Sequence, residues 1–472
     1  MQQEFEFADR LYYCYPRYKE EKLTHRRFKH SDIIPLINKL KNINIFSVNK
    51  AGSSIQGRDI FLIKIGNGKK KIFLWSQMHG DESTATMAIF DIFNFFNAGD
   101  EFDDIKKSIL KKTTIYFMPM VNPDGAEIYE RRNAVDIDIN RDAVHQQTPE
   151  GRILRNIFEN IKPDFGFNLH DQSTKYSVGR GPNVAALSFL APPINYKKSI
   201  DQVRKKAIML IAENYLMLSE YIPGHIAKYQ DDFEPRAFGD NFQKWGASTI
   251  LIESGGWKND PEKQFLRKLN FIVLLSSFKS ITEGNYKQQK QIVYDEIPYN
   301  AEFIFNTILR NLECERDGTK YKIDIGINHE EIKESYNNDI SYRSSIEDIG
   351  DLSTFFGYND FDFSGYMAEP GKIFDKKFNS IEEIRKSDIA ALYKLGFTDV
   401  ILNSKNFNKA QTELPINIWV NNSPRGSNEI ELKSVPNLVI KKNNEVQYIV
   451  INGFVQEVNN SEKTILNGLV FH

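Results

Sequence analysis

Short apolar runs alternate with longer segments of helical spacing along the first 285 residues of the chain. Short uninterrupted apolar runs are typical of buried strands, and apolar residues at intervals of three and four are typical of helices. The strand-like runs lie at 43–48, 60–65, 72–75, 114–120, 165–169 and 249–252. The helical segments lie at 31–40, 84–97, 103–111 and 261–284. Strands that alternate with helices predict an α/β fold, with a mixed, mainly parallel twisted sheet flanked by helices.

The end of the chain has a different pattern of polar and apolar positions. The alternation at 320–327 predicts a strand with one exposed face, and short apolar runs after residue 437 predict antiparallel strands. Ser380 opens a capping box, and Gly396 is expected to end the helix that follows it. We therefore expect a smaller α+β region here, which supports or covers a cleft or mediates assembly.

A polar linker at 283–291 separates these two parts, and the residues before position 31 are rich in charge and tyrosine. A length of 472 residues favours more than one domain. We therefore divide the chain into an N-terminal arm at 1–30, a main domain at 31–285 and an accessory region at 292–472. The arm is expected to pack on the surface of the main domain.

Composition limits the classes of partner. The formal net charge of −2 indicates neither a nucleic-acid-binding protein nor a polybasic membrane-binding protein. Cys14 and Cys314 lie far apart without metal-ligand spacing, so we expect a reducing compartment and no disulfide framework. No apolar span has the length of a membrane segment, and the first residues lack the pattern of an export signal. We therefore expect a cytoplasmic protein, unless a leader has been removed.

Residues with metal-binding or catalytic chemistry stand at the ends of several predicted strands. His79 and Glu82 follow one strand, and His170 and Glu253 end two others. In an open α/β sheet, ligands bind outside the carboxyl ends of the strands, so we expect these side chains to meet. A single His-x-x-Glu pair is weak evidence, because an isolated polar side chain is ordinarily solvated or satisfied in the core. Several strand ends that all carry such residues are strong evidence.

The residue types fit a catalytic zinc site. Such a site takes three nitrogen or oxygen ligands from the protein and leaves a fourth position for water. A loop after the strand at 114–120 adds Arg131, Asn140 and Arg141 near the same edge of the sheet. Surface ion pairing is the commoner fate of arginine in general. Here the arginines share one loop with other polar residues at a strand end, which favours a role in the site.

The order of these residues resembles that of the zinc carboxypeptidase family, of the carboxypeptidase A type, across residues 30–285. Six elements in the same order make the resemblance specific. They are His79-x-x-Glu82, Asn122-Pro123-Asp124-Gly125, Arg131, Asp138-x-Asn140-Arg141, His170 and Glu253.

The resemblance implies a metal centre and a catalytic carboxylate. One Zn²⁺ per chain would be bound by His79, Glu82 and His170. Glu253 would be the general base and later the proton donor. Asp138 matches the residue that orients the first histidine.

The resemblance also implies groups that bind the substrate. Arg131, with Arg132 as the alternative, would polarise the scissile carbonyl. Asn140 and Arg141 would bind a terminal carboxylate of the substrate. Arg58 matches an arginine of a subsite near the family's cleft.

The sequence departs from the family in two places. The family usually has a tyrosine on a mobile loop that closes over the substrate, and Tyr229 and Phe233 are the candidates here. The position that sets the preference for a side chain falls near Gly239 and Asp240, and the sequence leaves that preference open.

Three functions are compatible with these residues. The first is a zinc metallocarboxypeptidase that hydrolyses the C-terminal peptide bond of a peptide by metal-activated water. The second is a zinc amidohydrolase of the same fold that acts on murein peptides or acylated amino acids, for which Arg180 and Arg236 would add positive charge unless they are ordinary surface residues. The third is an inactive metal-binding interaction protein, which would have no need of Glu253.

Overall fold

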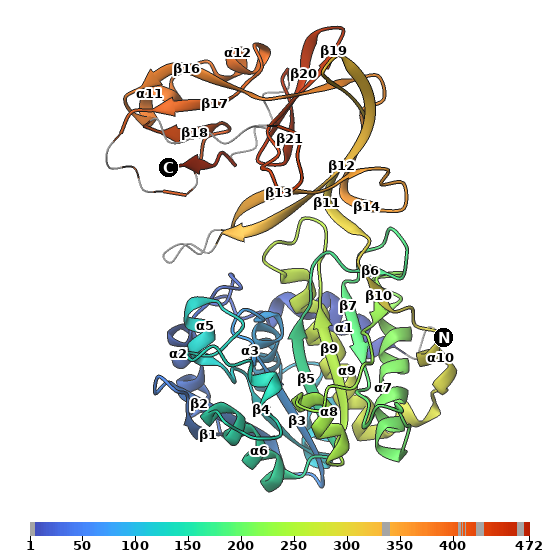
Figure 1. Ribbon diagram of the computed structural model, residues 1–472. Helices are drawn as coiled ribbons and strands as arrows, with labels where there is room; N and C mark the ends of the chain where they lie inside the picture. Colours follow the sequence, from blue (N-terminus) through green and yellow to red (C-terminus); the bar gives the residue numbers. More distant parts are fainter. Residues whose placement is uncertain are drawn as a thin grey trace. The chain divides into compact units, whose positions relative to one another are not determined.

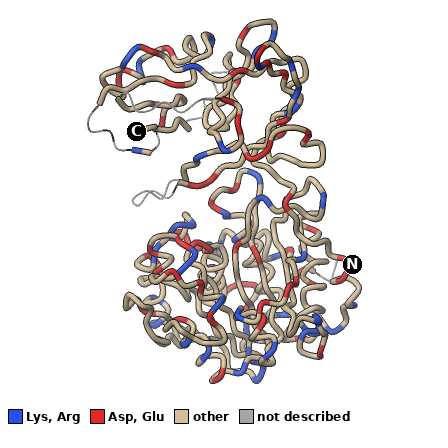
Figure 2. Tube along the Cα trace, in the orientation of Figure 1, with Lys and Arg blue, Asp and Glu red and all other residues tan. Residues whose placement is uncertain are grey.

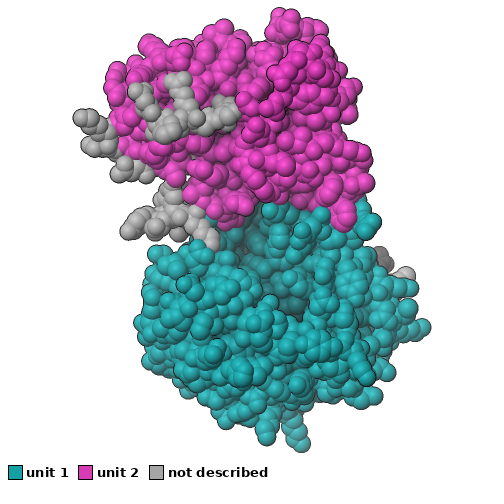
Figure 3. All heavy atoms as spheres, in the orientation of Figure 1, with its two compact units in different colours: residues 1–302 teal, residues 303–472 magenta. Residues whose placement is uncertain are grey.

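The computed structural model describes residues 5–332, 340–404, 407, 409, 410, 412–421, 429–459 and 467–472. The chain divides into two compact units, Met1–Glu302 and Phe303–His472, which Figure 3 shows in different colours. The candidate site lies in the first unit.

The first unit extends beyond the expected domain end at residue 285, because the segment that follows it folds onto the same unit. Its strand β10 (Asn300–Ala301) pairs antiparallel with β6 (Ser177–Val178). Its helical elements are η3 (Asn285–Gln288) and α10 (Gln291–Asp295). The boundary between the units therefore follows residue 302 rather than the polar segment 283–291.

An eight-stranded sheet forms the centre of the first unit (Figure 1). Its strands are β1 (Phe46–Ser53), β2 (Asp59–Gly66), β3 (Lys70–Ser76), β4 (Thr113–Met118), β5 (Phe165–Asp171), β7 (Leu187–Leu190), β8 (Ile226–Lys228) and β9 (Ser248–Ser254). Their order is β1-β2-β4-β3-β5-β9-β7-β8. The central strands β4, β3, β5 and β9 are parallel, whereas β1, β2 and β4 pair antiparallel, as do β7 and β9. The sheet confirms the predicted α/β class with a mixed, mainly parallel sheet.

Helices cover both faces of this sheet. They are α1 (Glu6–Cys14), α2 (His30–Leu40), α3 (Thr84–Asn97), α4 (Asp103–Lys112), α5 (Pro123–Ile128), α6 (Pro149–Ile161), α7 (Gln202–Leu218), α8 (Phe238–Lys244) and α9 (Gln264–Glu283), with the 3-10 turns η1 (Tyr15–Arg17) and η2 (Ile139–Arg141). Successive residues of a strand point to opposite faces. On β3, Ile72 and Leu74 join a core with α1, α2, α3, α7 and α9, whereas Phe73 and Trp75 join a smaller core with α6 and α8.

The residues before α2 belong to the core rather than to a surface arm. Arg267 on α9 is completely buried, and its guanidinium bonds both carboxylate oxygens of Asp91 on α3, at 2.7 and 2.5 Å. The same guanidinium donates to the backbone oxygens of Glu20 and Leu23, and the Tyr15 hydroxyl donates to Asp91 at 3.0 Å. A buried ion pair requires such additional hydrogen bonds. The N-terminal segment supplies these hydrogen bonds. The high content of charged residues in this segment had suggested a position on the surface instead.

The described residues of the second unit form two sheets and two short helices. The larger sheet has the strands β11 (Ile304–Arg316), β12 (Thr319–Ile332), β13 (Ser341–Gly350), β14 (Phe356–Asp362), β15 (Met367–Pro370), β19 (Leu438–Lys442), β20 (Glu445–Ile451) and β21 (Phe454–Glu457). The smaller sheet has the strands β16 (Lys372–Phe378), β17 (Phe397–Leu402), β18 (Asn417–Val420) and β22 (Val470–Phe471). Strands β19, β20 and β21 are antiparallel, as predicted, and the unit confirms the predicted α+β region.

One predicted helix of this unit is divided in two. Ser380 caps α11 (Ile381–Arg385) by accepting a hydrogen bond from the Glu383 N–H, as the capping box predicted. A second helix, α12 (Ile389–Lys394), then begins because Asp388 accepts a hydrogen bond from the Ala391 N–H and forms a new cap. The prediction of a single helix that continues to Gly396 is therefore wrong.

Charged residues are distributed over the whole chain. Figure 2 shows Lys and Arg interspersed with Asp and Glu along both units, in keeping with the near-zero net charge. Of the helices in the described ranges, none combines the length and the apolar character needed to cross a membrane.

Candidate metal centre and active site

The carboxyl ends of neighbouring parallel strands carry the candidate residues. The register of β5 and β9 places His170 directly beside Glu253, and the turn after β3 brings His79 to the same edge of the sheet. Gly80 in this turn packs against the backbone of Gly125, where an added Cβ would lie 2.1 Å from the carbonyl carbon. Only glycine fits without a shift of the backbone. The structure thus brings together residues that the sequence placed at separate strand ends.

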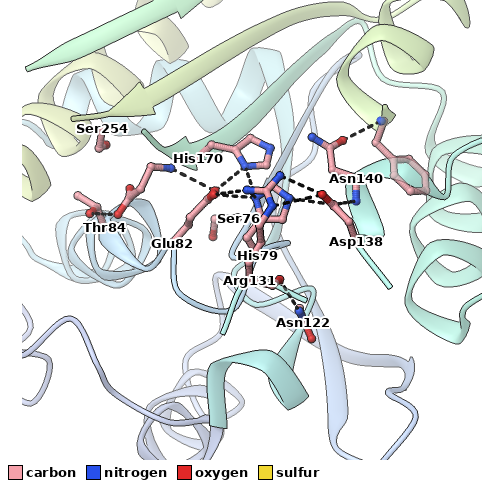
Figure 4. Close-up of polar contacts among 12 residues, drawn as sticks. Ser76, His79, Glu82, Thr84, Asn122, Arg131, Asp138, Asn140, His170 and Ser254 are labelled. Atoms are coloured by element: carbon pink, nitrogen blue, oxygen red, sulfur yellow. Dashed lines mark hydrogen bonds and ion pairs between the residues drawn. The ribbon is translucent and has the colours of Figure 1, made fainter. Parts of the chain in front are cut away.

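Three of these side chains form a compact cluster of metal-binding atoms (Figure 4). Nδ1 of His79 lies 2.7 Å from Oε1 of Glu82, and Nδ1 of His170 lies 2.6 Å from Oε2 of the same carboxylate. The two Nδ1 atoms are 3.2 Å apart. All three residues are buried. Two nitrogen atoms and a carboxylate therefore face one point, from the turn between β3 and α3 and from the end of β5.

Asp138 and Arg131 orient this cluster. Oδ1 of Asp138 lies 3.1 Å from Nε2 of His79, which places the proton on Nε2 and leaves the Nδ1 lone pair for the cluster. Arg131 donates to Oδ2 of Asp138 through Nε and Nη2, and its Nη1 lies 3.1 Å from both Nδ1 of His79 and Oε1 of Glu82. Arg132 instead donates to a backbone oxygen of its own loop. The structure therefore brings Arg131, not Arg132, to the cluster.

Burial and neighbouring charges act on the pKa values of this cluster in opposite directions. Burial alone would raise the pKa of Glu82, but the two imidazoles beside it outweigh burial and hold that pKa well below its ordinary value. Burial lowers the pKa of His170 against the opposing charge of Glu82. The cluster thus keeps its carboxylate ionised and His170 neutral. Metal binding requires these states of Glu82 and His170. The pKa of His79 is raised, because burial is outweighed by Glu82 and Asp138, so His79 must stay or become neutral to bind a metal.

The donor set fits zinc. Two imidazole nitrogens and one carboxylate oxygen match the ligands of catalytic zinc sites. Nδ1 of His79 carries only a lone pair when its Nε2 donates to Asp138, so it faces the cluster as an acceptor for a cation. The ligand atoms of His79, Glu82 and His170 lie within 4.8 Å of one another. These three residues would therefore hold the metal.

Glu253 faces the same cleft. The cleft has a volume of about 510 Å³ and is also lined by His79, Glu82, Arg131, Asn140, Arg141 and His170. Burial raises the pKa of Glu253 well above its ordinary value, and the charges of Glu82 and Asp171 add to this effect. A carboxylate in this environment accepts a proton readily, which is the property of a general base.

A buried ion pair joins the strands that carry the site. The sequence did not indicate this pair. Nζ of Lys263 lies 3.2 Å from Oδ2 of Asp171 and donates to the backbone oxygen of Ser254 at 3.1 Å. Asp171 also accepts a hydrogen bond from Thr84, at 2.7 Å, and its N–H donates to Glu82. The pair connects β5, β9 and the start of α3. Asp171 could be suspected from its place at a strand end, but nothing in the sequence marks Lys263 as its partner.

We expect Lys263→Met to destabilise the protein by about 3–5 kcal/mol, because it leaves the Asp171 carboxylate buried without its counter-charge. The measurement is the free energy of unfolding in urea. The double variant Lys263→Met/Asp171→Asn is the control, and it should recover part of the loss since it removes both charges. A loss below about 1 kcal/mol in the single variant would show that the pair contributes no more than an exposed one.

Asn140 and Arg141 lie on η2 and line the cleft. Oδ1 of Asn140 accepts a hydrogen bond from the Phe238 N–H at 2.9 Å, which ties this loop to the start of α8. Nε of Arg141 lies 3.3 Å from Oε2 of Glu234, and Glu234 also binds Arg236 through two hydrogen bonds. A guanidinium has five N–H donors, so these contacts leave Arg141 donors for a ligand carboxylate.

Arg58 is not brought to this cleft. Its Nη1 lies 2.8 Å from Oδ1 of Asp124, whose completely buried side chain requires a counter-charge. This ion pair holds the loop of Arg58 in place, and the expected substrate-binding role of Arg58 stays a prediction. Of the two candidates for the lid, Tyr229 lines the cleft, whereas Phe233 packs edge-on against Tyr196.

Residues 36–151 match the model of the family described as zinc carboxypeptidase. Carboxypeptidase SOL1 of Arabidopsis thaliana is 29% identical over 104 residues, which cover 21% of each chain. Probable carboxypeptidase 2 of Arthroderma benhamiae is 23% identical over 142 residues, which cover 29% of this chain and 26% of that protein. The chain thus matches only a fifth to about a quarter of the length of these relatives.

Solved structures also match part of this chain. The metallo-carboxypeptidase from Burkholderia cenocepacia is 17% identical with a TM-score of 0.44, and the match covers 54% of this chain and 70% of that one. Bovine thrombin-activatable fibrinolysis inhibitor, solved with tick carboxypeptidase inhibitor, is 14% identical with a TM-score of 0.45, and the match covers 56% of this chain and 100% of that one.

The family match includes most of the residues that carried the resemblance. His79, Glu82, Arg131, Asn140 and Arg141 lie inside it. The remaining ligand and the candidate base lie beyond it, on β5 and β9, where the structure joins them to the cluster. The resemblance is therefore confirmed over residues 36–151, which match the model of the zinc carboxypeptidase family.

Proposed function

We propose that the protein is a zinc-dependent carboxypeptidase that hydrolyses the C-terminal peptide bond of a peptide. The proposal rests on the residues that line one cleft. It holds the cluster of His79, Glu82 and His170, the buried carboxylate of Glu253, and the guanidinium of Arg141. The family match of residues 36–151 supports a metal-dependent hydrolase.

Each residue of the cleft has a separate role in the proposed hydrolysis. Zn²⁺ bound by the cluster would lower the pKa of a water molecule and polarise the substrate carbonyl. Glu253 would take a proton from the attacking water and pass it to the leaving amine. Arg131 keeps a permanent positive charge beside the cluster, where it can stabilise the negative charge that develops on the carbonyl oxygen. Asp138 holds both His79 and Arg131 in place.

Arg141 and Asn140 give the cleft a means to select the end of a chain. The free donors of Arg141 form a fork that matches a carboxylate. Asn140 is fixed by its bond to α8, so the two residues present donors from a rigid loop. A murein peptide would gain less from Arg236 than the sequence suggested, because Glu234 already neutralises that side chain. These contacts favour a substrate that carries a free carboxylate.

Amidation of the terminal carboxylate is expected to lower kcat/KM by at least about 30-fold, or about 2 kcal/mol, because Arg141 would face a neutral group. The test compares the zinc-loaded protein on free-acid and amidated forms of one peptide, with mass spectrometry to identify the released residue. Equal rates on both forms would contradict selection of a chain end and favour an endopeptidase or a deacylase.

A further inference from the structure

The segment that follows α9 contributes residues to the cleft. Asn300 and Ala301, which form the strand β10, both line it. β10 pairs antiparallel with β6, and Figure 1 shows the two strands side by side. This strand lies beyond residue 285, where the resemblance to the zinc carboxypeptidase family ends. The roles described so far do not use β10.

Several contacts fix β10 against the main sheet. The N–H of Lys228, the last residue of β8, donates to the Pro298 oxygen at 2.7 Å. The Lys228 side chain is buried, and its Nζ donates to the backbone oxygen of Asp295 at 3.1 Å. The same Nζ lies 4.4 Å from the ring centre of Tyr299, within the range of a cation–π contact. Asn300 therefore follows a segment that is held in place at several points.

The side chain of Asn300 has one buried acceptor without a donor. Nε2 of Gln172 donates to the Ala185 oxygen at 3.1 Å, so Oε1 of Gln172 is left to accept from Nδ2 of Asn300, at 3.0 Å. These bonds determine which atom of the Asn300 amide faces Gln172. Oδ1 of Asn300 then has no hydrogen-bond partner within the described residues, although the residue is only 4% exposed. A buried acceptor without a donor is costly, so a ligand N–H that reaches it would be stabilised.

Asn300 lies on the side of the metal cluster away from the loop proposed to bind a terminal carboxylate. That loop is tied to the start of α8, and Gly239 of α8 packs against Asn168, two residues before His170. Asn300 bonds Gln172, two residues after His170. Two residues of a strand span about 6–7 Å. The cluster therefore lies between the carboxylate-binding loop and Asn300.

We propose that Asn300 binds a backbone N–H of the substrate on the amino side of the scissile bond, within two residues of that bond. The inference rests on the proposed function, which places the terminal carboxylate at Arg141 and the scissile carbonyl at the metal cluster. A peptide bound in this way continues past His170 toward Gln172. Each extended residue adds about 3.3–3.6 Å, so two residues cover the distance to Asn300. The peptide backbone supplies one N–H for nearly every residue, which is the donor that Oδ1 lacks.

The direct test replaces a single backbone N–H of the substrate by an ester oxygen, which keeps the shape of the peptide and removes the donor. One series of peptides carries the replacement at the residue before the scissile bond, at the residue before that, or, as a control, at the fifth residue from the C-terminus. For one of the first two positions, kcat/KM of the zinc-loaded full chain should fall by about 5- to 150-fold, as expected when a buried acceptor loses its donor. The control position should leave kcat/KM unchanged. Equal values at all three positions would overturn the proposal.

A matched pair of variants tests whether Asn300 is the acceptor. Asn300→Leu keeps the approximate size of the side chain and removes Oδ1, so it should raise KM for the all-amide peptide by a similar factor with kcat little changed. It should also abolish the difference between the all-amide and the ester peptides, whereas a merely structural role would lower activity on both and keep that difference. Gln230→Ala is the control, because Gln230 is an exposed amide that lines the same cleft. An Asn300→Leu protein that still discriminates between the two peptides would contradict the assignment.

Calorimetric binding separates this proposal from the proposed function, because it needs no turnover. The full chain with Glu253→Gln should bind the all-amide peptide about 5- to 150-fold more tightly than the sensitive ester peptide. Such discrimination, together with an unmodified protein that cleaves none of the peptides, would support the role of Asn300 and refute the peptidase function. Cleavage of all peptides at equal rates, with equal binding, would support the peptidase function and refute the role of Asn300.

Discussion

Replacement of Glu253 by glutamine is expected to lower kcat by about 10²–10⁴-fold, the range for loss of general acid–base catalysis. The variant keeps the shape of the side chain and removes its ability to take up a proton. Burial and the charges of Glu82 and Asp171 raise the pKa of Glu253, so its ionised form is a stronger base than an ordinary carboxylate. KM should change little, since the residue lies beside the metal cluster rather than at Arg141.

Steady-state kinetics on a peptide with a free C-terminus measures this effect, and zinc content with circular dichroism shows that the fold is intact. Glu302→Gln is the matched control, because Glu302 is an exposed carboxylate that lines the same cleft. It should leave kcat within about twofold of the unmodified protein. A Glu253→Gln protein with unchanged kcat would show that another group carries the proton.

Replacement of His170 by alanine should have the second large effect, which is a loss of affinity for zinc. His170→Ala leaves His79 and Glu82 as the remaining members of a three-ligand site. Loss of a hydrogen-bond partner of a ligand typically costs 10- to 100-fold in metal affinity, so loss of a ligand itself is expected to cost more than about 100-fold. Competition with a chromophoric chelator measures the affinity directly and does not depend on catalysis.

His145→Ala is the control for this experiment, because His145 is exposed and does not line the cleft. Its zinc affinity should equal that of the unmodified chain. Circular dichroism of His170→Ala distinguishes loss of a ligand from loss of the fold. If the His170→Ala protein retained zinc with unchanged affinity, the metal would have to be held elsewhere.

The sequence predicted the metal cluster because its residues end neighbouring parallel strands. Parallel strands bring their carboxyl ends to one edge, so strand identity alone was enough to group His79, Glu82, His170 and Glu253. Arg58 shows the limit of this reasoning. The sequence places it close to motif residues, but its direction is set by the buried charge of Asp124, which no local pattern reveals.

Other features depended on contacts between distant segments. Lys263 joins Asp171 across 92 positions of the chain, and Arg141 meets Glu234 from a separate loop. The preference for a strand or a helix is local, whereas the partner of a charge is set by tertiary packing. For the same reason the division of the helix after Ser380 was missed, because Asp388 forms a second cap inside a segment with good helical spacing.

The buried contact between Arg267 and Asp91 bears on how far the family-matched segment is an independent piece of protein. That segment begins at residue 36, after the backbone oxygens of Glu20 and Leu23 and the hydroxyl of Tyr15 that complete this contact. A fragment cut at the family boundaries would contain Asp91 but neither Arg267 nor the N-terminal segment, so it would leave a carboxylate without its counter-charge and its hydrogen-bond donors. The segment that matches the family model is therefore smaller than the unit that folds, and residues 36–151 alone are not expected to form a transferable module.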